Sequence, residues 1–354
     1  MTGGPATAPP RRWRRPLLFA VLCTACLAAS VAYVASAAGR QDQSGATPSV
    51  PMTDLATVAG QPRVLFENTA AGPGQGRLGL APLAAPDAAR ALTGLACGRA
   101  DFVIDIGVCL TDQRSPLDPS EALIFDADDQ VLSTIRVGGI PSRARVSPDG
   151  RRASVTSFVS GHSYNAGAFS TQTLLLDLEK GKVIDDLERF RVFRQGREMK
   201  ETDFNFWGVT FADDNDRFYA TLGTGDHRYL VQGSLRDRRV EVLRDDTECP
   251  SLSPDNRRIA YKKRIPGPGG QLTWRLTVLD LATMAETPLA ETRSVDDQAA
   301  WLDDHNVLYG LRHGADGSEL DHDRPADTWV VPADGTGTAR LFIPQAWSAV
   351  VLPR

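Results

Sequence analysis

The chain has 354 residues, a net charge of −5 and a hydrophobic content of 42%, which are the values of an ordinary globular protein. Its length would allow about two or three average domains, although repeat architectures often exceed that size within one domain. The body of the chain is acidic and has no basic stripe. This composition argues against a nucleic-acid partner, because neutralisation of phosphates supplies most of the affinity for nucleic acids.

The N-terminus predicts export of the body. Four arginines between residues 11 and 15 precede an uncharged apolar segment over residues 16–38, which at about 1.5 Å per residue is long enough to cross a hydrocarbon core of about 30 Å. Because positive flanks stay in the cytoplasm, we expect residues 1–15 there, a transmembrane signal-anchor over 16–38, a flexible linker over 39–60 and an extracytoplasmic domain over 61–354. The alternatives are secretion after signal cleavage near Ala37 and lipid attachment at Cys26.

The cysteines fit an exported chain. Cys97 and Cys109 flank a short predicted strand pair, so we expect a disulfide between them outside the cytoplasm. Cys249 has no evident partner and is expected to be a buried free thiol. With no further pair at metal-ligand spacing outside the apolar segment, the sequence predicts neither a metal site nor a cofactor.

A strand, turn and strand unit recurs along the chain. It is clearest at Ser147–Gly150 and Ser253–Asn256, where Ser-Pro-Asp-Gly and Ser-Pro-Asp-Asn each separate two apolar strands. Proline presets the backbone of a turn, and Gly or Asn accepts the left-handed conformation that closes it. The stretches Ala212–Asn215 and Leu302–His305 match the unit without its proline.

Each unit continues with a third and a fourth short strand, and no long stretch has apolar residues at helical spacing. Ala212, Ser253 and Leu302 are separated by 41 and 49 residues, the spacing of propeller blades. The larger gap before Ala212 indicates an insertion over 190–203. The sequence therefore predicts an all-β propeller.

The first part of the chain, from Val64 to Gly139, contains enough short strands for two weaker blades. Together with the four clear units they predict six blades, and seven is the alternative. The C-terminal stretch Trp347–Leu352 has no strands after it, whereas Val64 has none before it within the body. We therefore expect the last strand to complete the first blade and to close the ring.

The repeat resembles that of the TolB-type β-propellers, also called the WD40-like Pro-Asp repeat. The resemblance rests on the apolar-Ser-Pro-Asp-Gly/Asn-Arg-Arg pattern and on the later Val-Leu-Asp-Leu strand, and it covers about Pro141 to Pro344 directly. It implies a TolB-like six-bladed propeller in which first strands line the central channel. The N-terminal segment would make this chain a membrane-anchored member, with an anchor in place of the separate N-terminal domain of the TolB-type proteins. Residues just before those strands would then ring one mouth; they are Ser142, Arg143, Asp203, Asn205, Glu248, Asp296, Asp297 and Gln298, with Gln345 in the closing blade.

Polar and acidic residues at one mouth predict a binding site for an amine, a cation or a basic segment of a partner. We expect a monomeric, non-catalytic scaffold that binds a protein or ligand, with a protein partner in the cell envelope. One alternative is a lyase or hydrolase that uses an Asp or Glu of the mouth as base. Another is a structural envelope protein whose mouth residues bond only to neighbouring turns and water.

Two loops carry further candidate residues. Tyr164 and Phe169 lie in a loop between a second and a third strand and are candidates for partner contact. The loop over 313–327 gathers carboxylates around His322, but its spacing does not match a calcium loop. We expect this second loop to be solvated.

Overall fold

The computed structural model describes residues 19–31, 50–111, 120–159, 170–267, 270, 272–314 and 324–353. The chain forms two compact units, Met1–Ser49 and Val50–Arg354. In the first unit, residues 19–31 of the predicted 16–38 segment are helical, and the rest of that segment lies outside the described residues. Among the described residues, no helix combines the length and the apolar character needed to cross a membrane.

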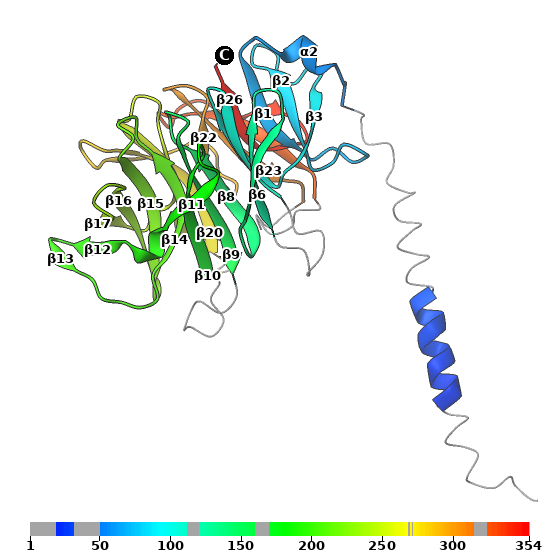
Figure 1. Ribbon diagram of the computed structural model, residues 1–354, viewed down its shortest axis with the longest axis horizontal. Coiled ribbons are helices and arrows are strands. Elements are labelled where there is room, and N and C mark those ends of the chain that lie inside the picture. Colours follow the sequence, from blue (N-terminus) through cyan, green and yellow to red (C-terminus); the bar gives the residue numbers. More distant parts are fainter. Residues whose placement is uncertain are drawn as a thin grey trace, which may run out of the picture. The chain divides into compact units, whose positions relative to one another are not determined.

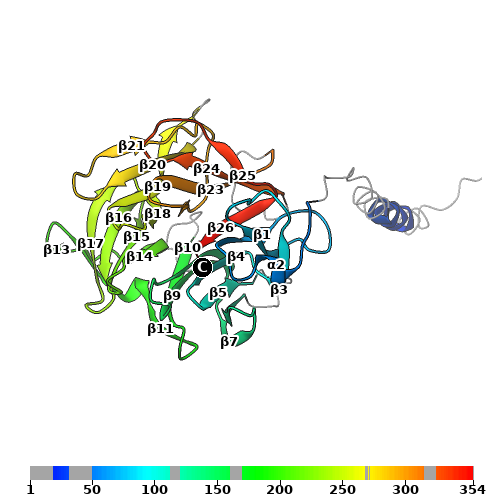
Figure 2. The same cartoon turned by 90° about the horizontal axis from the view of Figure 1, so that it is seen from above.

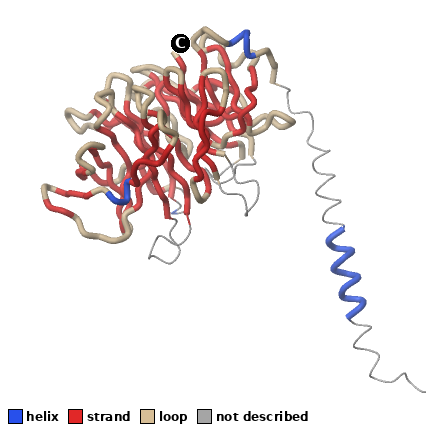
Figure 3. The backbone as a smooth tube through the Cα atoms, in the orientation of Figure 1, coloured by secondary structure: helices blue, strands red, loops and turns tan. Residues whose placement is uncertain are grey.

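The second unit is an all-β six-bladed propeller, as predicted, with its sheets arranged around a common axis (Figures 1 and 2). Strands dominate its trace (Figure 3). Blade 1 consists of β26 (Ala346–Leu352), β1 (Arg63–Asn68), β2 (Arg77–Pro82) and β3 (Ala91–Ala96). Blade 2 consists of β4 (Arg99–Val103), β5 (Ile106–Leu110), β6 (Glu121–Asp126) and β7 (Val131–Arg136). Blade 3 consists of β8 (Ile140–Val146), β9 (Arg152–Val159), β10 (Ser170–Asp177) and β11 (Lys182–Asp186).

The remaining blades follow the same order from the axis outward. Blade 4 contains β14 (Asn205–Phe211), β15 (Arg217–Thr224), β16 (His227–Ser234) and β17 (Arg239–Asp245). Blade 5 contains β18 (Glu248–Leu252), β19 (Arg258–Pro266), β20 (Leu272–Asp280) and β21 (Glu286–Pro288). Blade 6 contains β22 (Ala300–Trp301), β23 (Asn306–Arg312), β24 (Ala326–Pro332) and β25 (Arg340–Ile343).

The ring closes between the two ends of the propeller. The C-terminal strand β26 pairs antiparallel with β1, with Val351 opposite Val64 and Ala346 opposite Asn68. Figure 2 shows red β26 beside blue β1. This pairing satisfies the edge of β1, which would otherwise be exposed.

The predicted insertion enlarges blade 4. After the 3₁₀ helix η1 (Leu187–Arg189), the strands β12 (Arg191–Arg194) and β13 (Arg197–Glu198) form a hairpin, and β12 pairs in parallel with β17. The sheet of blade 4 therefore has six strands, and Figure 1 shows the hairpin projecting at its outer edge.

The compact unit begins at Val50, before the predicted boundary at residue 61. The short helix α2 (Leu55–Val58) buries Val58 completely, and Met52 forms a β-bridge with Arg90. These contacts hold the second half of the expected flexible linker against blade 1. The composition of this stretch predicted a flexible linker and did not indicate that Val58 would pack against the propeller and order it.

The core consists of six clusters of buried apolar side chains, one at each interface between neighbouring blades. At the interface of blades 3 and 4, for example, Leu175 packs with Phe206 and Val231. Burial of each such side chain contributes about 1.5–3 kcal/mol. Each blade therefore depends on its neighbours for stability, and the packed blades surround the central channel rigidly.

Candidate functional site

The propeller has two faces with different connections. The turns between first and second strands lie on one face, which we call the turn face. The first strands begin on the opposite face, which we call the loop face because it also carries the loops between second and third strands. The predicted mouth belongs to the loop face.

Five of the predicted mouth residues do come together, and among the described residues the space between them holds side chains of the chain itself. Asp297 lies before blade 6, and one of its carboxylate oxygens is 3.8 Å from Nη2 of Arg99 in blade 2. Its other oxygen accepts a hydrogen bond of 3.0 Å from the Gly310 amide. The Gln298 amide group donates to the carbonyl oxygens of Val209 and Pro250, in blades 4 and 5. These contacts bridge the channel.

A buried lysine organises the other side of this mouth. Lys262 projects from β19 and pairs with Asp296, and its ammonium group lies 4.6 Å from the centroid of the Trp274 ring. Burial opposes the charge of Lys262, but the Cys249 sulfur and the carboxylates of Asp296 and Glu248 outweigh burial, so the pKa of Lys262 is raised. Lys262 therefore stays protonated at neutral pH.

The remaining charges of this mouth are matched in the same way. Glu248 is 2.7 Å from Nε of Arg264. Arg143 donates to the Ser142 carbonyl oxygen at 2.7 Å and reaches the Cys249 sulfur at 3.4 Å. Cys249 is a buried free thiol, as predicted. The carboxylates predicted to attract a cationic ligand thus face cations of the chain itself.

Two predicted residues have a different environment. Asn205 accepts hydrogen bonds from the Ser170 hydroxyl and the Thr171 amide, and so joins blade 4 to β10 of blade 3. Asp203 binds the Thr224 hydroxyl and the Gly225 amide at a turn of its own blade. Partial burial would raise the pKa of Asp203, but these hydrogen bonds prevail and lower it. A carboxylate with a lowered pKa is a weak general base.

β-Bulges in the first strands of blades 4 and 5 bring the charged residues of the mouth close together. The register of β14 shifts between Trp207 and Thr210, and that of β18 shifts between Glu248 and Ser251. Gly208 and Cys249, inside these bulges, have positive φ angles of 64° and 50°. A Cβ atom at Gly208 would lie 2.7 Å from the Cα of Cys249. The two backbones therefore approach so closely that only glycine fits at this position.

The opposite end of the channel, at the turn face, is hollow. A cavity of about 350 Å³ is lined by residues from all six blades. Apolar side chains dominate its wall, including Phe211, Leu252 and Trp301, and the half-buried Arg145 and the buried Asp101 add two charges. We call this cavity the funnel. Sequence reasoning missed it because it placed the site where first strands begin, whereas the funnel lies where they end.

The rim of the funnel is a chain of linked turns. In blades 3 and 5 the first serine of the turn binds the aspartate two residues later, at 2.6 and 2.5 Å. Neighbouring turns are joined by Arg152 to the Asn215 carbonyl oxygen, by the Asp213 amide to Asn256, and by the Asp255 amide to Asp304. The similar geometry of these turns thus yields a rigid rim across blades 3 to 6.

The wall of the funnel contains one unusual carboxyl group. Burial raises the pKa of Asp101, although the nearby Arg145 and hydrogen bonds from the Val146 and Phe102 amides oppose this shift. Arg145 donates to the Ala299 carbonyl oxygen at 3.0 Å, across the channel between blades 3 and 6. The Arg145 bond thus links blades 3 and 6 at the wall of the funnel.

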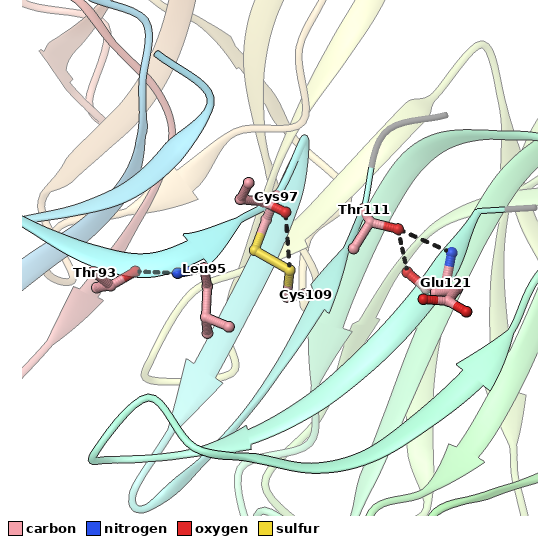
Figure 4. Close-up of a disulfide and its surroundings, with 7 residues drawn as sticks. Thr93, Leu95, Cys97, Cys109, Thr111 and Glu121 are labelled. Carbon is pink, nitrogen blue, oxygen red and sulfur yellow. Dashed lines mark hydrogen bonds between the residues drawn. A yellow bond between two sulfur atoms is a disulfide. The ribbon is translucent and has the colours of Figure 1, made fainter. Parts of the chain in front are cut away.

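The cysteine prediction agrees with the structure. Cys97 and Cys109 form a disulfide with a Cα–Cα distance of 5.4 Å (Figure 4). Cys97 follows the outer strand of blade 1, and Cys109 lies in β5 of blade 2, so the bond fastens the closing blade to its neighbour. The loop with Tyr164 and Phe169 and the carboxylate cluster around His322 lie outside the described residues.

Comparison with known proteins supports the fold. No family model matches the sequence, and no curated protein sequence matches it either. Among solved structures, TolB from Acinetobacter baumannii matches with a TM-score of 0.56 at 16% identity, over 84% of this chain and 67% of that chain. A chain of the nidogen/laminin complex matches with a TM-score of 0.53 at 11% identity, over 82% of this chain and 98% of that chain.

The six sheets and the closure by β26 define this chain as a six-bladed β-propeller. The structural match extends this assignment: the fold is that of a TolB-like propeller, as the sequence repeat indicated. At these levels of identity, the comparison establishes the fold alone.

Proposed function

We propose that this chain is a non-catalytic scaffold that binds a protein partner through the funnel at its turn face. One observation carries the proposal: the funnel takes its wall from all six blades, whereas the described charges at the opposite mouth are engaged in ion pairs of the chain itself. A ligand at the funnel meets a preorganised surface. At the other mouth it would have to displace buried charge pairs, which is costly.

The chemistry of the funnel favours binding over catalysis. Its wall combines Trp301, Phe211 and Leu252 with a surrounding ring of polar turns, which is the apolar centre and polar rim of protein-recognition surfaces. Trp301 is held by a hydrogen bond from its indole to the Ser251 carbonyl oxygen, at 2.9 Å. Such a fixed aromatic side chain loses little entropy on binding and is a typical anchor.

We further propose that the propeller is tethered to the membrane and faces the outside of the cytoplasm. The arginines at 11–15 and the apolar segment 16–38 support this location, and so does the disulfide, which is stable in oxidising compartments. Alkaline phosphatase fused after Arg354 should be active in cells, and the protein should sediment with membranes. An inactive fusion would contradict export, and a soluble, shortened chain would indicate secretion after cleavage.

The experiment that tests the binding site uses a bulky charge in the funnel. Tagged full-length protein carrying Leu252→Arg should lose the partner that the wild type captures from cross-linked membranes. The matched control is Leu272→Arg, because Leu272 is 57% exposed at the start of β20, on the loop face. Asp213→Arg, at the exposed rim, provides a second test if Leu252→Arg lowers the melting temperature. Retention of the partner by both funnel variants would refute the proposal.

A further inference from the structure

We propose that the funnel binds a basic side chain of the partner and that the carboxylate of Asp101 recognises its charge, an inference that rests on the proposed function because the partner must enter the funnel. Asp101 lies in β4, the first strand of blade 2. It lines the funnel, although it is only 5% exposed. The proposed site thus combines a cavity with a buried charged group on its wall.

Asp101 is a buried carboxylate without a cation of its own. One of its oxygens accepts a hydrogen bond of 2.7 Å from the Val146 amide, at the end of β8 in blade 3. This bond holds the carboxylate in place but does not neutralise its charge. Asp101 forms no ion pair with any of the residues that the structure describes. Buried aspartates are almost always paired, as Asp297 is with Arg99.

The arginine of the funnel wall is engaged elsewhere. The Arg145 guanidinium donates to the carbonyl oxygen of Ala299 at 3.0 Å and to that of Ala144 at 3.5 Å. It acts on Asp101 only as a nearby charge, which lowers the pKa of that carboxyl, while burial raises the pKa by more. A cation that enters the funnel would therefore supply an ion pair that the described part of the chain does not supply.

The charge of the funnel and of its rim favours a cation. The charged residues of the lining are Asp101, Asp213 and Arg145, so two carboxylates face one guanidinium. Seven aspartates and five arginines lie in the rim turns, which cover residues 147–152, 212–217, 253–258 and 302–306. This surplus of negative charge attracts a cationic group and repels an anionic one.

The rest of the lining suits the hydrocarbon part of a basic side chain. It includes the partly exposed apolar residues Val103, Leu252, Ala300 and Val351. Lysine and arginine bury their methylene stems against such surfaces and keep the charge at the tip. A volume of about 350 Å³ is at the lower end for ligand pockets. The funnel therefore admits a side chain of the partner rather than a folded element.

Cation binding and proton binding would compete at Asp101. Burial raises the pKa of Asp101 in the free protein, whereas a bound cation favours the ionised form. The affinity for a cation should therefore fall as the pH is lowered toward this raised pKa. The other charged groups of the lining are Arg145, which stays protonated, and Asp213, which is exposed at the rim.

The test measures fluorescence anisotropy of short labelled peptides on purified full-length protein in detergent. One peptide carries a central lysine among glycine and serine residues, and its matched peptide carries norleucine, which keeps the stem without the charge. The variant is Asp101→Asn, which retains an oxygen for the Val146 amide. The control is Asp237→Asn, at an exposed carboxylate between β16 and β17, outside the funnel lining.

The wild type and the control should bind the lysine peptide about tenfold more tightly than the norleucine peptide, whereas Asp101→Asn should bind both alike. The preference of the wild type should decrease as the pH is lowered from 8 to 4. No binding of the lysine peptide, or equal binding of both peptides by the wild type, would overturn the inference, and this comparison needs no protein variant. Tighter binding of a peptide with a central glutamate would also overturn it.

Two further arms separate the possible causes of failure. Butylamine that displaces the lysine peptide as well as unlabelled peptide does would contradict a protein segment as the ligand and assign the site to a free amine. Leu252→Arg separates this inference from the proposed function. Loss of the captured partner in Leu252→Arg, together with an unchanged lysine preference in Asp101→Asn, would overturn the role of Asp101 and leave the funnel proposal intact. The reverse pattern would contradict the proposed function alone.

Discussion

The two ends of the channel are built from the same inner strands but have opposite properties. Where the strands begin, bulges at Gly208 and Cys249 crowd the backbones, and the buried Lys262 pairs with the partly exposed Asp296. Where they end, tight turns spread outward and leave the funnel. The difference shows that one end of a propeller channel can hold paired charges while the other end keeps a cavity.

The largest expected effect concerns the crowded end. Gly208→Ala should lower the free energy of unfolding by about 4 kcal/mol, because the new Cβ would add a backbone clash to the strain of a positive φ angle. Gly225→Ala is the control, since Gly225 has a φ of 52° but nothing within 4 Å of the new Cβ. It should cost only about 1 kcal/mol. Equal costs in urea denaturation would show that the strands are not in close contact.

The second-largest expected effect on stability concerns the disulfide that joins the closing blade to blade 2. Replacement of Cys97 and Cys109 by serine should cost about 3 kcal/mol, because the bond closes a loop with a sequence separation of 12 residues. Calorimetry should show a lower melting temperature, and a reducing agent should have the same effect on the wild type only. A wild-type melting temperature that does not respond to reduction would contradict a structural disulfide.

A third prediction compares a buried with an exposed ion pair. Lys262→Met should cost about 2 kcal/mol, because it leaves Asp296 without its cation at the filled mouth, whereas Glu248 keeps its pair with Arg264. Lys180→Met should leave the free energy of unfolding almost unchanged, because the Lys180 side chain is 63% exposed and its pair with Asp177 is screened by solvent. Chemical denaturation of both variants decides whether the filled mouth stabilises the ring. Similar small costs would show that it does not.

The smallest effect is a pH dependence at the edge of blade 4. Burial, with Asp186 nearby, raises the pKa of Glu188 to about 7, so the folded chain holds a proton that the unfolded chain loses above its ordinary pKa of 4.5. This group therefore lowers stability as the pH rises from about 4.5 to 7. Glu188→Gln should raise stability by about 1 kcal/mol at pH 8, after allowance for solvent screening, and by nothing at pH 4. An equal effect at both pH values would contradict the raised pKa.

Much of the fold was predictable because its signals are local. The Ser147–Gly150 and Ser253–Asn256 turns fix strand pairs within a few residues, and both turns form as expected. The closing strand β26 also followed from the sequence, since a blade that lacks its first strand can be completed only by the other end of the chain. Val50–Gly60 was less predictable, because its docking depends on a few nonlocal contacts.

The candidate site was less predictable because its contacts join distant blades. The sequence indicated which acidic residues lie near the loop-face mouth, but not that Arg99, Lys262 and Arg264 would neutralise them. Arg99 was missed because β4 begins with the polar residues Arg99 and Asp101, which hide the apolar pattern of a first strand. The funnel was missed because its wall is shared by six blades, and the repeated turns were interpreted only as signals for strand pairs although they form its rim.

The most direct test of the account is photo-crosslinking in cells at both ends of the channel. A benzophenone amino acid would replace Asp213 at the funnel rim in one variant and Thr202 at the loop face in the other; both residues are exposed. A binding surface at the funnel predicts a protein adduct from position 213 and none from position 202. An adduct from position 202 alone would contradict it and would place the binding surface at the filled end.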